Sequence, residues 1–119
     1  RGPDGRFLPW GHQDNPAWAN TNQSLPDGMR PTPVSAFPTD ESPYGVRGLV
    51  GNSRDVCIND PGKEHAQWRM FRGGSWSHMA ATGRLAVRTG GIKQGISFSS
   101  GVRLAVVARL GSEERAVGE

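Results

Sequence analysis

The chain has 119 residues and a formal net charge of +3, which suits one small domain. Hydrophobic residues make up only 34% of the chain, and its 17 Gly and 9 Pro approach the share found in disordered chains. Four Trp, four Phe and one Tyr nevertheless favour an ordered, loop-rich domain held by aromatic side chains. The basic residues form no run of the kind that binds nucleic acid, and no apolar stretch is long enough to cross a membrane, so we expect neither a nucleic-acid nor a membrane partner.

The single cysteine, Cys57, excludes an internal disulfide framework and a zinc site built from several cysteines. The sequence shows no signal peptide and begins with a polar Gly/Pro stretch instead of Met. We therefore expect a processed or excised piece of a longer protein, and we favour a cytoplasmic location.

Turn sequences and short extended pieces alternate through the first half of the chain. The tripeptides at 3–5 and 26–28 are both Pro-Asp-Gly, which predicts turns. Residues 7–11 predict a short extended piece, and the proline-bracketed residues 33–38 suit a sheet edge or an extended loop. A first full strand is predicted over residues 55–58.

Three more strands are predicted in the second half, over residues 68–72, 85–88 and 100–107. In the first of them, the alternation places Trp68, Met70 and Arg72 on one side. Residues 109–119 are charged and small and predict a flexible tail.

The hexapeptide at 71–76, Phe-Arg-Gly-Gly-Ser-Trp, is the sequence feature around which we expect the chain to be organised. Two adjacent glycines predict unusual backbone dihedrals or a close approach by another segment. The Trp76 side chain offers a large apolar area with one N–H to satisfy, so it predicts the anchor of the core.

Four arginines after the middle of the chain have two interpretations. A guanidinium can bind a carboxylate or a peptide backbone through paired donors, or it can satisfy buried carbonyls within its own fold. We expect the second role for Arg72 and Arg103, which lie beside strand glycines, and leave both roles open for Arg84 and Arg88. The histidines share no metal-ligand spacing and predict surface residues: His12, His65 and His78.

Seven stretches together, in this order, resemble the formylglycine-generating enzyme family, also called sulfatase-modifying factor domains. They are GRF…PWG at 5–11, PV…FP at 33–38, SPYGV at 42–46, GNSRDVC at 51–57, RGGSW at 72–76, Arg84…Arg88, and GVRL at 101–104. The resemblance covers residues 1–108 and only the C-terminal half of the family domain. It implies an α+β fold, the formylglycine-generating-enzyme type of C-type-lectin fold, with short antiparallel strands and much irregular loop.

The resemblance also implies a partner. Because the N-terminal half of the family domain is missing, we expect a companion chain or segment that carries it, and we expect residues 1–119 not to fold stably without it.

The departures from the family pattern concern catalysis. In catalytic members, two cysteines after the Trp of the RGGSW motif bind copper and activate oxygen, and the matching positions here are His78 and Gly83. One imidazole cannot replace two thiolates at a Cu(I) site, so copper is not expected. Cys57 is better explained as a buried structural residue than as a catalytic one.

The resemblance is therefore closest to non-catalytic branches of the family, and residues 45–55 look most like the domains linked to bacterial Ser/Thr kinases. The favoured function is a non-catalytic ligand- or protein-binding module. The alternative is part of an oxygen-dependent enzyme, a formylglycine-generating oxidase or a sulfoxide synthase, whose other half lies on a missing segment.

A calcium site is the cofactor that the resemblance implies. Its ligands would be Asn20, the Thr21 carbonyl, Asp27 and the Met29 carbonyl. The competing interpretation is that Asn20 and Asp27 form ordinary Asx turns.

A second calcium site of the family maps onto Gly48, the carbonyls of Gly51 and Ser53, and Asp55. It is not expected here, because Gly48 has no side chain and Asp55 is shorter than the usual Glu.

The binding surface for a protein or peptide ligand is predicted around the segment after Trp76, together with the glycine-rich loop at 90–99. In the family, this surface faces the substrate, and loops on a rigid scaffold commonly carry binding. The predicted ligand-binding residues are Ser77, His78, Met79, Arg84, Arg88 and Gln94.

Overall fold

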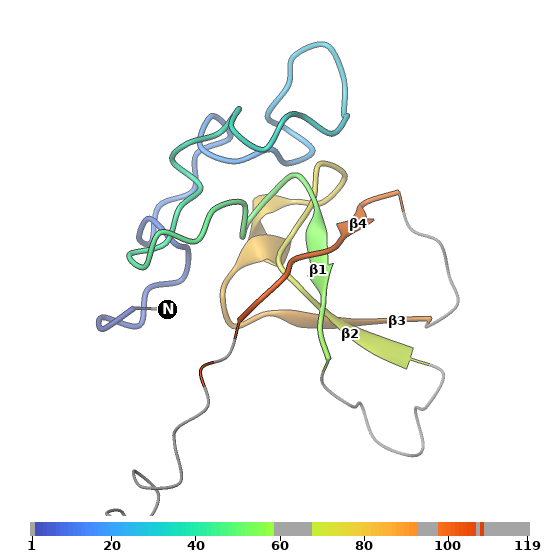
Figure 1. The fold of residues 1–119 in the computed structure, drawn as a ribbon. Helices are drawn as coiled ribbons and strands as arrows, with labels where there is room; N and C mark the ends of the chain where they lie inside the picture. The colour runs from blue at the N-terminus through green and yellow to red at the C-terminus, as the bar shows by residue number, and fades with distance from the viewer. Residues whose placement is uncertain (1, 59–67, 93–97, 107, 109–119) are drawn as a thin grey trace, which may run out of the picture.

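The structure is a computed structural model that describes residues 2–58, 68–92, 98–106 and 108. These residues form four short strands and one 3-10 helix: β1 (Arg54–Val56), β2 (Trp68–Arg72), η2 (Ala80–Gly83), β3 (Arg88–Ile92) and β4 (Ser100–Gly101). Figure 1 shows residues 2–50, in blue to green, as an irregular lobe beside the sheet. We call this part the loop lobe. No helix within the described ranges has the length and hydropathy needed to cross a membrane.

The strands form one mixed sheet in the order β3-β2-β1-β4. Strand β2 pairs antiparallel with both β1 and β3, whereas β1 and β4 run parallel. A small mixed sheet with one short helix and long irregular connections confirms the α+β class expected from the sequence. Strand β2 has the predicted bounds, but β4 ends at Gly101 and does not continue to residue 107 as predicted.

The strand predicted over residues 85–88 is wrong, because the pairing with β2 begins at Arg88 and continues to Ile92. The two glycines of β3, Gly90 and Gly91, would ordinarily weaken a strand, but here they make room for aromatic rings of β2. A Cβ at Gly90 would lie 3.2 Å from the Trp68 ring, and a Cβ at Gly91 would collide with the Phe71 ring. Pairing with an aromatic strand therefore overrides the low strand propensity of glycine.

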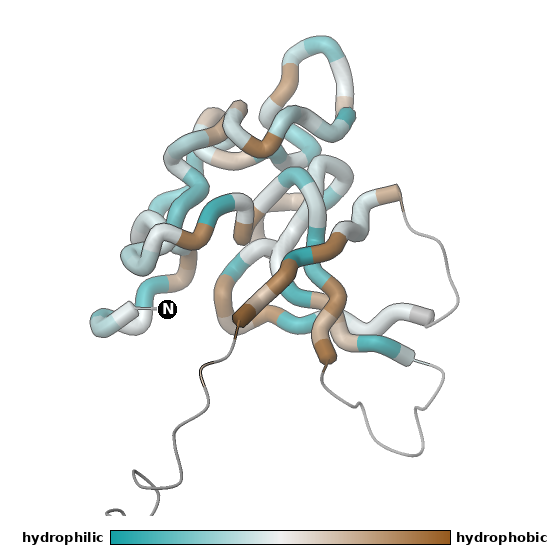
Figure 2. The backbone as a smooth tube through the Cα atoms, viewed as in Figure 1, coloured by the Kyte–Doolittle hydropathy of each residue, from teal (hydrophilic) through white to brown (hydrophobic). Residues whose placement is uncertain are grey.

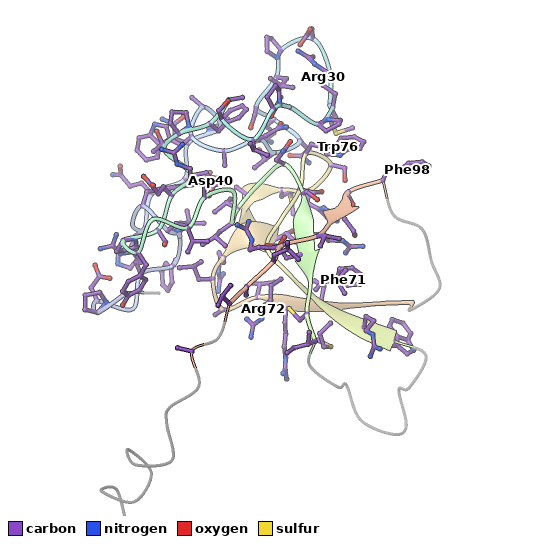
Figure 3. All side chains as sticks on the ribbon, viewed as in Figure 1. Arg30, Asp40, Phe71, Arg72, Trp76 and Phe98 are labelled. Carbon is purple, nitrogen blue, oxygen red and sulfur yellow. The ribbon has the colours of Figure 1, made fainter. Side chains whose placement is uncertain are left out.

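The apolar core lies in the loop lobe and not around Trp76, which corrects the expectation from the sequence. Leu8, Ala19 and Val50 are buried together, and Trp10 packs against them. Trp76 is only half-buried, and its indole N–H donates to the Phe98 carbonyl at 3.3 Å (Figure 3).

The glycines after β2 explain this arrangement, because they bring the backbone close to the irregular segment that contains Leu49 and Val50. Gly73 adopts a φ of 80°, and a Cβ there would lie 2.6 Å from the Leu49 carbonyl oxygen. A Cβ at Gly74 would collide with the Val50 carbonyl oxygen. The predicted unusual dihedral and close approach at these glycines are thus confirmed, but the neighbour is backbone and not an indole.

Candidate functional site

The segment Ser77-His78-Met79 forms a turn between the RGGSW motif and η2, and the buried Ser75 side chain forms hydrogen bonds with this turn. Ser75 is fully buried, and its Oγ lies 2.5 Å from His78 Nδ1 and 3.1 Å from Ser77 Oγ. Burial, together with the charge of Arg54, lowers the pKa of His78 below its ordinary value of 6.5. His78 is thus half-buried and held, and not the surface residue expected from the sequence.

A backbone hydrogen bond also links the same turn to the loop lobe. The His78 carbonyl accepts the backbone N–H of Asn22 at 3.0 Å. The next residue, Met79, has 61% of its surface exposed. The turn therefore has a rigid base and presents an apolar, unbranched side chain to solvent.

Arg84 follows η2 and lies against the N-terminal part of the chain. Its guanidinium carbon is 5.5 Å from the centre of the Phe7 ring, and the backbone N–H of Leu85 donates to the Phe7 carbonyl at 2.8 Å. Arg84 also lines a cavity of about 310 Å³ together with Arg72. The other lining residues are Leu49, Asp55, Gly73, Gly83 and Leu85.

Three charged residues lie side by side across the sheet, and two of them, Asp55 and Arg72, line this cavity. Asp55 on β1 is paired with Arg72 on β2, which in turn is paired with Arg88 on β3. Directly opposite residues of antiparallel strands place their side chains on the same face. We call Asp55, Arg72 and Arg88 the charged row.

The two arginines expected to satisfy carbonyls do so, which confirms that part of the sequence prediction. Arg72 donates to the Leu85 and Val87 carbonyls at 3.3 and 3.4 Å. Arg103 donates to the Gly48 carbonyl at 3.2 Å and to the Asp55 carboxylate at 2.8 Å.

The structure divides the predicted binding residues into two groups. Ser77, His78 and Met79 belong to the turn before η2, whereas Arg84 and Arg88 follow it. The turn residues do not line the cavity of Arg84 and Arg72. Gln94 lies outside the described residues, as do the other residues of 93–97 in the loop predicted at 90–99.

Asn20 is the best-placed member of the predicted calcium site. It is 1% exposed, and its Nδ2 donates to the Arg30 carbonyl at 2.9 Å. Its Oδ1 is buried and has no hydrogen-bond partner among the described residues. An unpaired buried amide oxygen is a suitable ligand for a hard cation.

The other predicted ligands fit less closely. Thr21 is buried, and its carbonyl accepts the backbone N–H of Ser24 at 3.2 Å. Asp27 is exposed and pairs with Arg30 at 2.7 Å, and this hydrogen bond lowers the pKa of Asp27. Met29 is exposed. Asp27 would have to leave Arg30 to join Asn20 at a cation.

At the residues that match the second calcium site of the family, an arginine side chain of the protein itself forms hydrogen bonds. The Asp55 carboxylate, which would be a ligand there, accepts a hydrogen bond from the Arg103 guanidinium, as does the Gly48 carbonyl. Within the described ranges, no three His, Cys, Asp or Glu side chains come together as a metal site.

Copper does not fit the two positions that match the family's cysteines. Gly83 is buried, and a Cβ there would lie 2.6 Å from the Val50 carbonyl oxygen, which leaves no room for a thiol. His78 Nδ1 is already held by Ser75. Cys57 follows β1, is half-buried, and donates its backbone N–H to the Met70 carbonyl at 2.8 Å.

Two features of this region were not predicted from the sequence. Ser75 was seen only as part of the motif, although its spacing of three from His78 is a signal for a local side-chain contact. The charged row was missed because its recognition needs the strand register, and the third strand was misplaced.

Comparison with known proteins identifies the family. The model of the family described as "Sulfatase-modifying factor enzyme 1-like domain" matches residues 1–108. A search of curated proteins found no significant match. Because the family match covers most of the chain, this protein belongs to the sulfatase-modifying factor family and has its formylglycine-generating-enzyme type of fold.

Proposed function

We propose that this domain is a non-catalytic module that binds a protein or peptide ligand, similar to the family members linked to bacterial Ser/Thr kinases. The observation that carries the proposal is the state of the two positions that match the copper cysteines. His78 is an imidazole held by Ser75, and Gly83 is enclosed by the backbone and side chain of Val50. These residues supply no pair of thiolates, which Cu(I) chemistry requires.

The ligand surface that we propose consists of the predicted residues Ser77, His78, Met79, Arg84, Arg88 and Gln94. Its support is a rigid base under exposed groups. Hydrogen bonds from Ser75 and Asn22 hold the His78 turn, while Met79, Arg84 and Arg88 are exposed. Methionine and arginine are enriched at protein interfaces.

Two measurements test this function in the intact protein. Incubation with copper and a cysteine-containing peptide should consume oxygen no faster than a protein-free control, and copper-dependent oxidation of that peptide would overturn the non-catalytic proposal. Panning of a random peptide library should enrich binders whose affinity falls about fivefold or more with Met79→Ala. A library that enriches nothing, or binders indifferent to Met79→Ala, would overturn the proposed surface.

A companion segment with the N-terminal half of the domain is the second part of the proposal. Its support is a series of apolar side chains left almost fully exposed just before and after β4. They are Phe98, Val102, Leu104 and Val106, with Ile58 after β1. Figure 2 shows the stretch after β4 as an extended, largely brown segment of the tube. An apolar strip of this kind suits contact with another protein segment.

We also propose that the domain binds calcium through Asn20, Asp27 and the carbonyls of Thr21 and Met29. The observation in favour is the buried Oδ1 of Asn20, which has no hydrogen-bond partner in the part of the chain that the structure describes. The ion would supply a positive charge to that oxygen and would link two turns of the loop lobe.

A further inference from the structure

Three arginines that lie near one another form no ion pair with a carboxylate among the described residues. Arg72 and Arg88 face each other across β2 and β3, and Arg84 lines the same cavity as Arg72. All three are exposed. Figure 3 shows Arg72 at the sheet.

The one carboxylate of the charged row does not neutralise them. Asp55 is opposite Arg72, but its Oδ2 binds Nε of Arg103 at 2.8 Å. The row therefore keeps a positive excess. Like charges placed directly opposite on neighbouring strands destabilise a sheet, so the Arg72–Arg88 pair works against the stability of the empty protein.

The guanidinium groups at the cavity are held in position. Carbonyls of Leu85 and Val87 orient Arg72 through one nitrogen, and Arg84 lies over the Phe7 ring. Each guanidinium has five N–H donors, so both keep donors for a ligand.

The cavity itself has the size and lining of a side-chain pocket. Its volume is about 310 Å³, and Leu49 and Leu85 give it apolar walls. Gly73 and Gly83 line the cavity with backbone alone.

We propose that this cavity binds a carboxylate of the peptide or protein ligand, through Arg72 and Arg84 with Arg88 adding charge. The inference rests on the proposed function and specifies its ligand as acidic. Arginine binds a carboxylate through two parallel hydrogen bonds, which adds direction to charge. A monoanion suits the cavity better than a phosphate dianion because Asp55 also lines it, and the apolar walls suit the methylene groups of Glu or Asp.

The test measures binding of defined probes to the intact protein at low salt by calorimetry. The probes are acetyl-Gly-Glu-Gly-Glu-Gly-amide, the same peptide with Gln for Glu, and inorganic phosphate. We expect the Glu peptide to bind more tightly than the Gln peptide or phosphate. Arg84→Gln should weaken the Glu peptide about tenfold or more, the loss expected for a charged hydrogen-bonded pair, whereas Arg88→Gln, which removes only a neighbouring charge, should weaken it about two- to fivefold.

The matched control is Arg30→Gln, which removes one exposed guanidinium in the loop lobe (Figure 3) and should leave affinity unchanged. A second pair of probes, acetyl-tetraglycine with a free and with an amidated C-terminus, distinguishes a chain-terminal carboxylate from a side-chain one. Binding of only the free form would assign the cavity to a C-terminus.

A stability measurement separates a binding role from a structural one. Arg88→Gln should raise the Tm of the unliganded protein, because it removes a like charge opposite Arg72, while it weakens the Glu peptide. Equal binding of the Glu and Gln peptides, tighter binding of phosphate, or an equal loss with Arg30→Gln would overturn the inference. If library-selected peptides lose affinity with Met79→Ala but not with Arg84→Gln, the proposed function stands and the carboxylate site falls.

Discussion

Both carboxylate oxygens of Asp40 accept the backbone N–H of Val50, at 3.2 and 3.1 Å. The same carboxylate accepts the N–H groups of Leu49 and Gly51. Asp40 is 2% exposed and Val50 is fully buried, so one side chain ties the backbone of a core segment to a distant loop (Figure 3). In a lobe with little regular secondary structure, this carboxylate replaces a strand partner.

Asp40→Ala should therefore unfold the loop lobe at much lower denaturant concentration. The change leaves three buried N–H groups without acceptors, and each unsatisfied group costs about 1–3 kcal/mol. We expect a loss of at least about 3 kcal/mol in the free energy of unfolding, measured by urea titration. Asp14→Ala, at an exposed position, is the control and should stay within about 0.5 kcal/mol of the parent. A similar small loss for both variants would contradict the role of Asp40.

The two glycines of β3 make a second, paired prediction. A Cβ at Gly91 would collide with the buried Phe71 ring, over which Arg54 also stacks at 4.2 Å. Gly91→Ala should therefore cost about 1–3 kcal/mol of stability through overpacking. Gly90→Ala meets only the Trp68 ring, at 3.2 Å and at a half-exposed side chain that can shift, so it should be nearly neutral. Thermal unfolding of both variants checks this, and equal losses would contradict it.

The elements that the sequence predicted well are those with a local signature. Alternation of Trp68, Met70 and Arg72 defined β2, and the paired glycines of the RGGSW motif predicted the close backbone approach at Gly73. The α+β class followed from the family resemblance, whereas aromatic, glycine and proline usage predicted only an ordered, loop-rich domain.

The rest depended on partners distant in the chain. The N–H groups that bind Asp40 lie nine to eleven residues further on and leave no side-chain pattern. The predicted strand ended where β3 begins, because the glycines of β3 have low strand propensity. They belong to the strand because they pack against the aromatic rings of β2. The charged row could not be seen before that register was known, since Arg88 was expected to end a strand and instead begins one.

Acid should weaken the fold through His78. Burial and Arg54 lower the pKa of His78 in the folded protein, so the unfolded chain binds a proton more readily. The stabilisation is fully present above about pH 6.5 and is lost as the pH falls toward the lowered folded-state pKa. The Tm of the parent should thus fall more between pH 7.5 and 5.5 than that of His78→Asn, whose amide can still reach Ser75 but does not titrate. Parallel pH profiles of the two proteins would contradict this.

Calcium should raise the Tm if Asn20 and Asp27 hold it. Binding to the native state alone adds about 2.7 kcal/mol at a hundredfold excess over the dissociation constant. Asp27→Ala should abolish the calcium response, whereas Arg30→Gln breaks the same exposed ion pair but keeps the ligand and should preserve the response. A Tm unaffected by chelator, or the same response in both variants, would contradict calcium binding.

The exposed apolar strip after β4 tests the companion segment. Leu104 is 92% exposed, so in residues 1–119 alone Leu104→Ser should change stability by less than about 0.5 kcal/mol. If a companion covers the strip in the intact protein, the same change removes a buried leucine and should cost about 2 kcal/mol. Val34→Ser, at an 88% exposed residue of the loop lobe, is the matched control and should be neutral in both contexts. Thermal unfolding of each pair gives the comparison.

Residues 1–119 alone should also melt broadly and associate, because the strip remains open to water. Two results together would show that nothing covers the strip. They are a monodisperse, cooperatively melting preparation of residues 1–119, and no change in the stability of the intact protein with Leu104→Ser. A loss confined to the intact protein would instead place the companion on Leu104, and Val102→Ser and Val106→Ser would then map how far along the strand its contact extends.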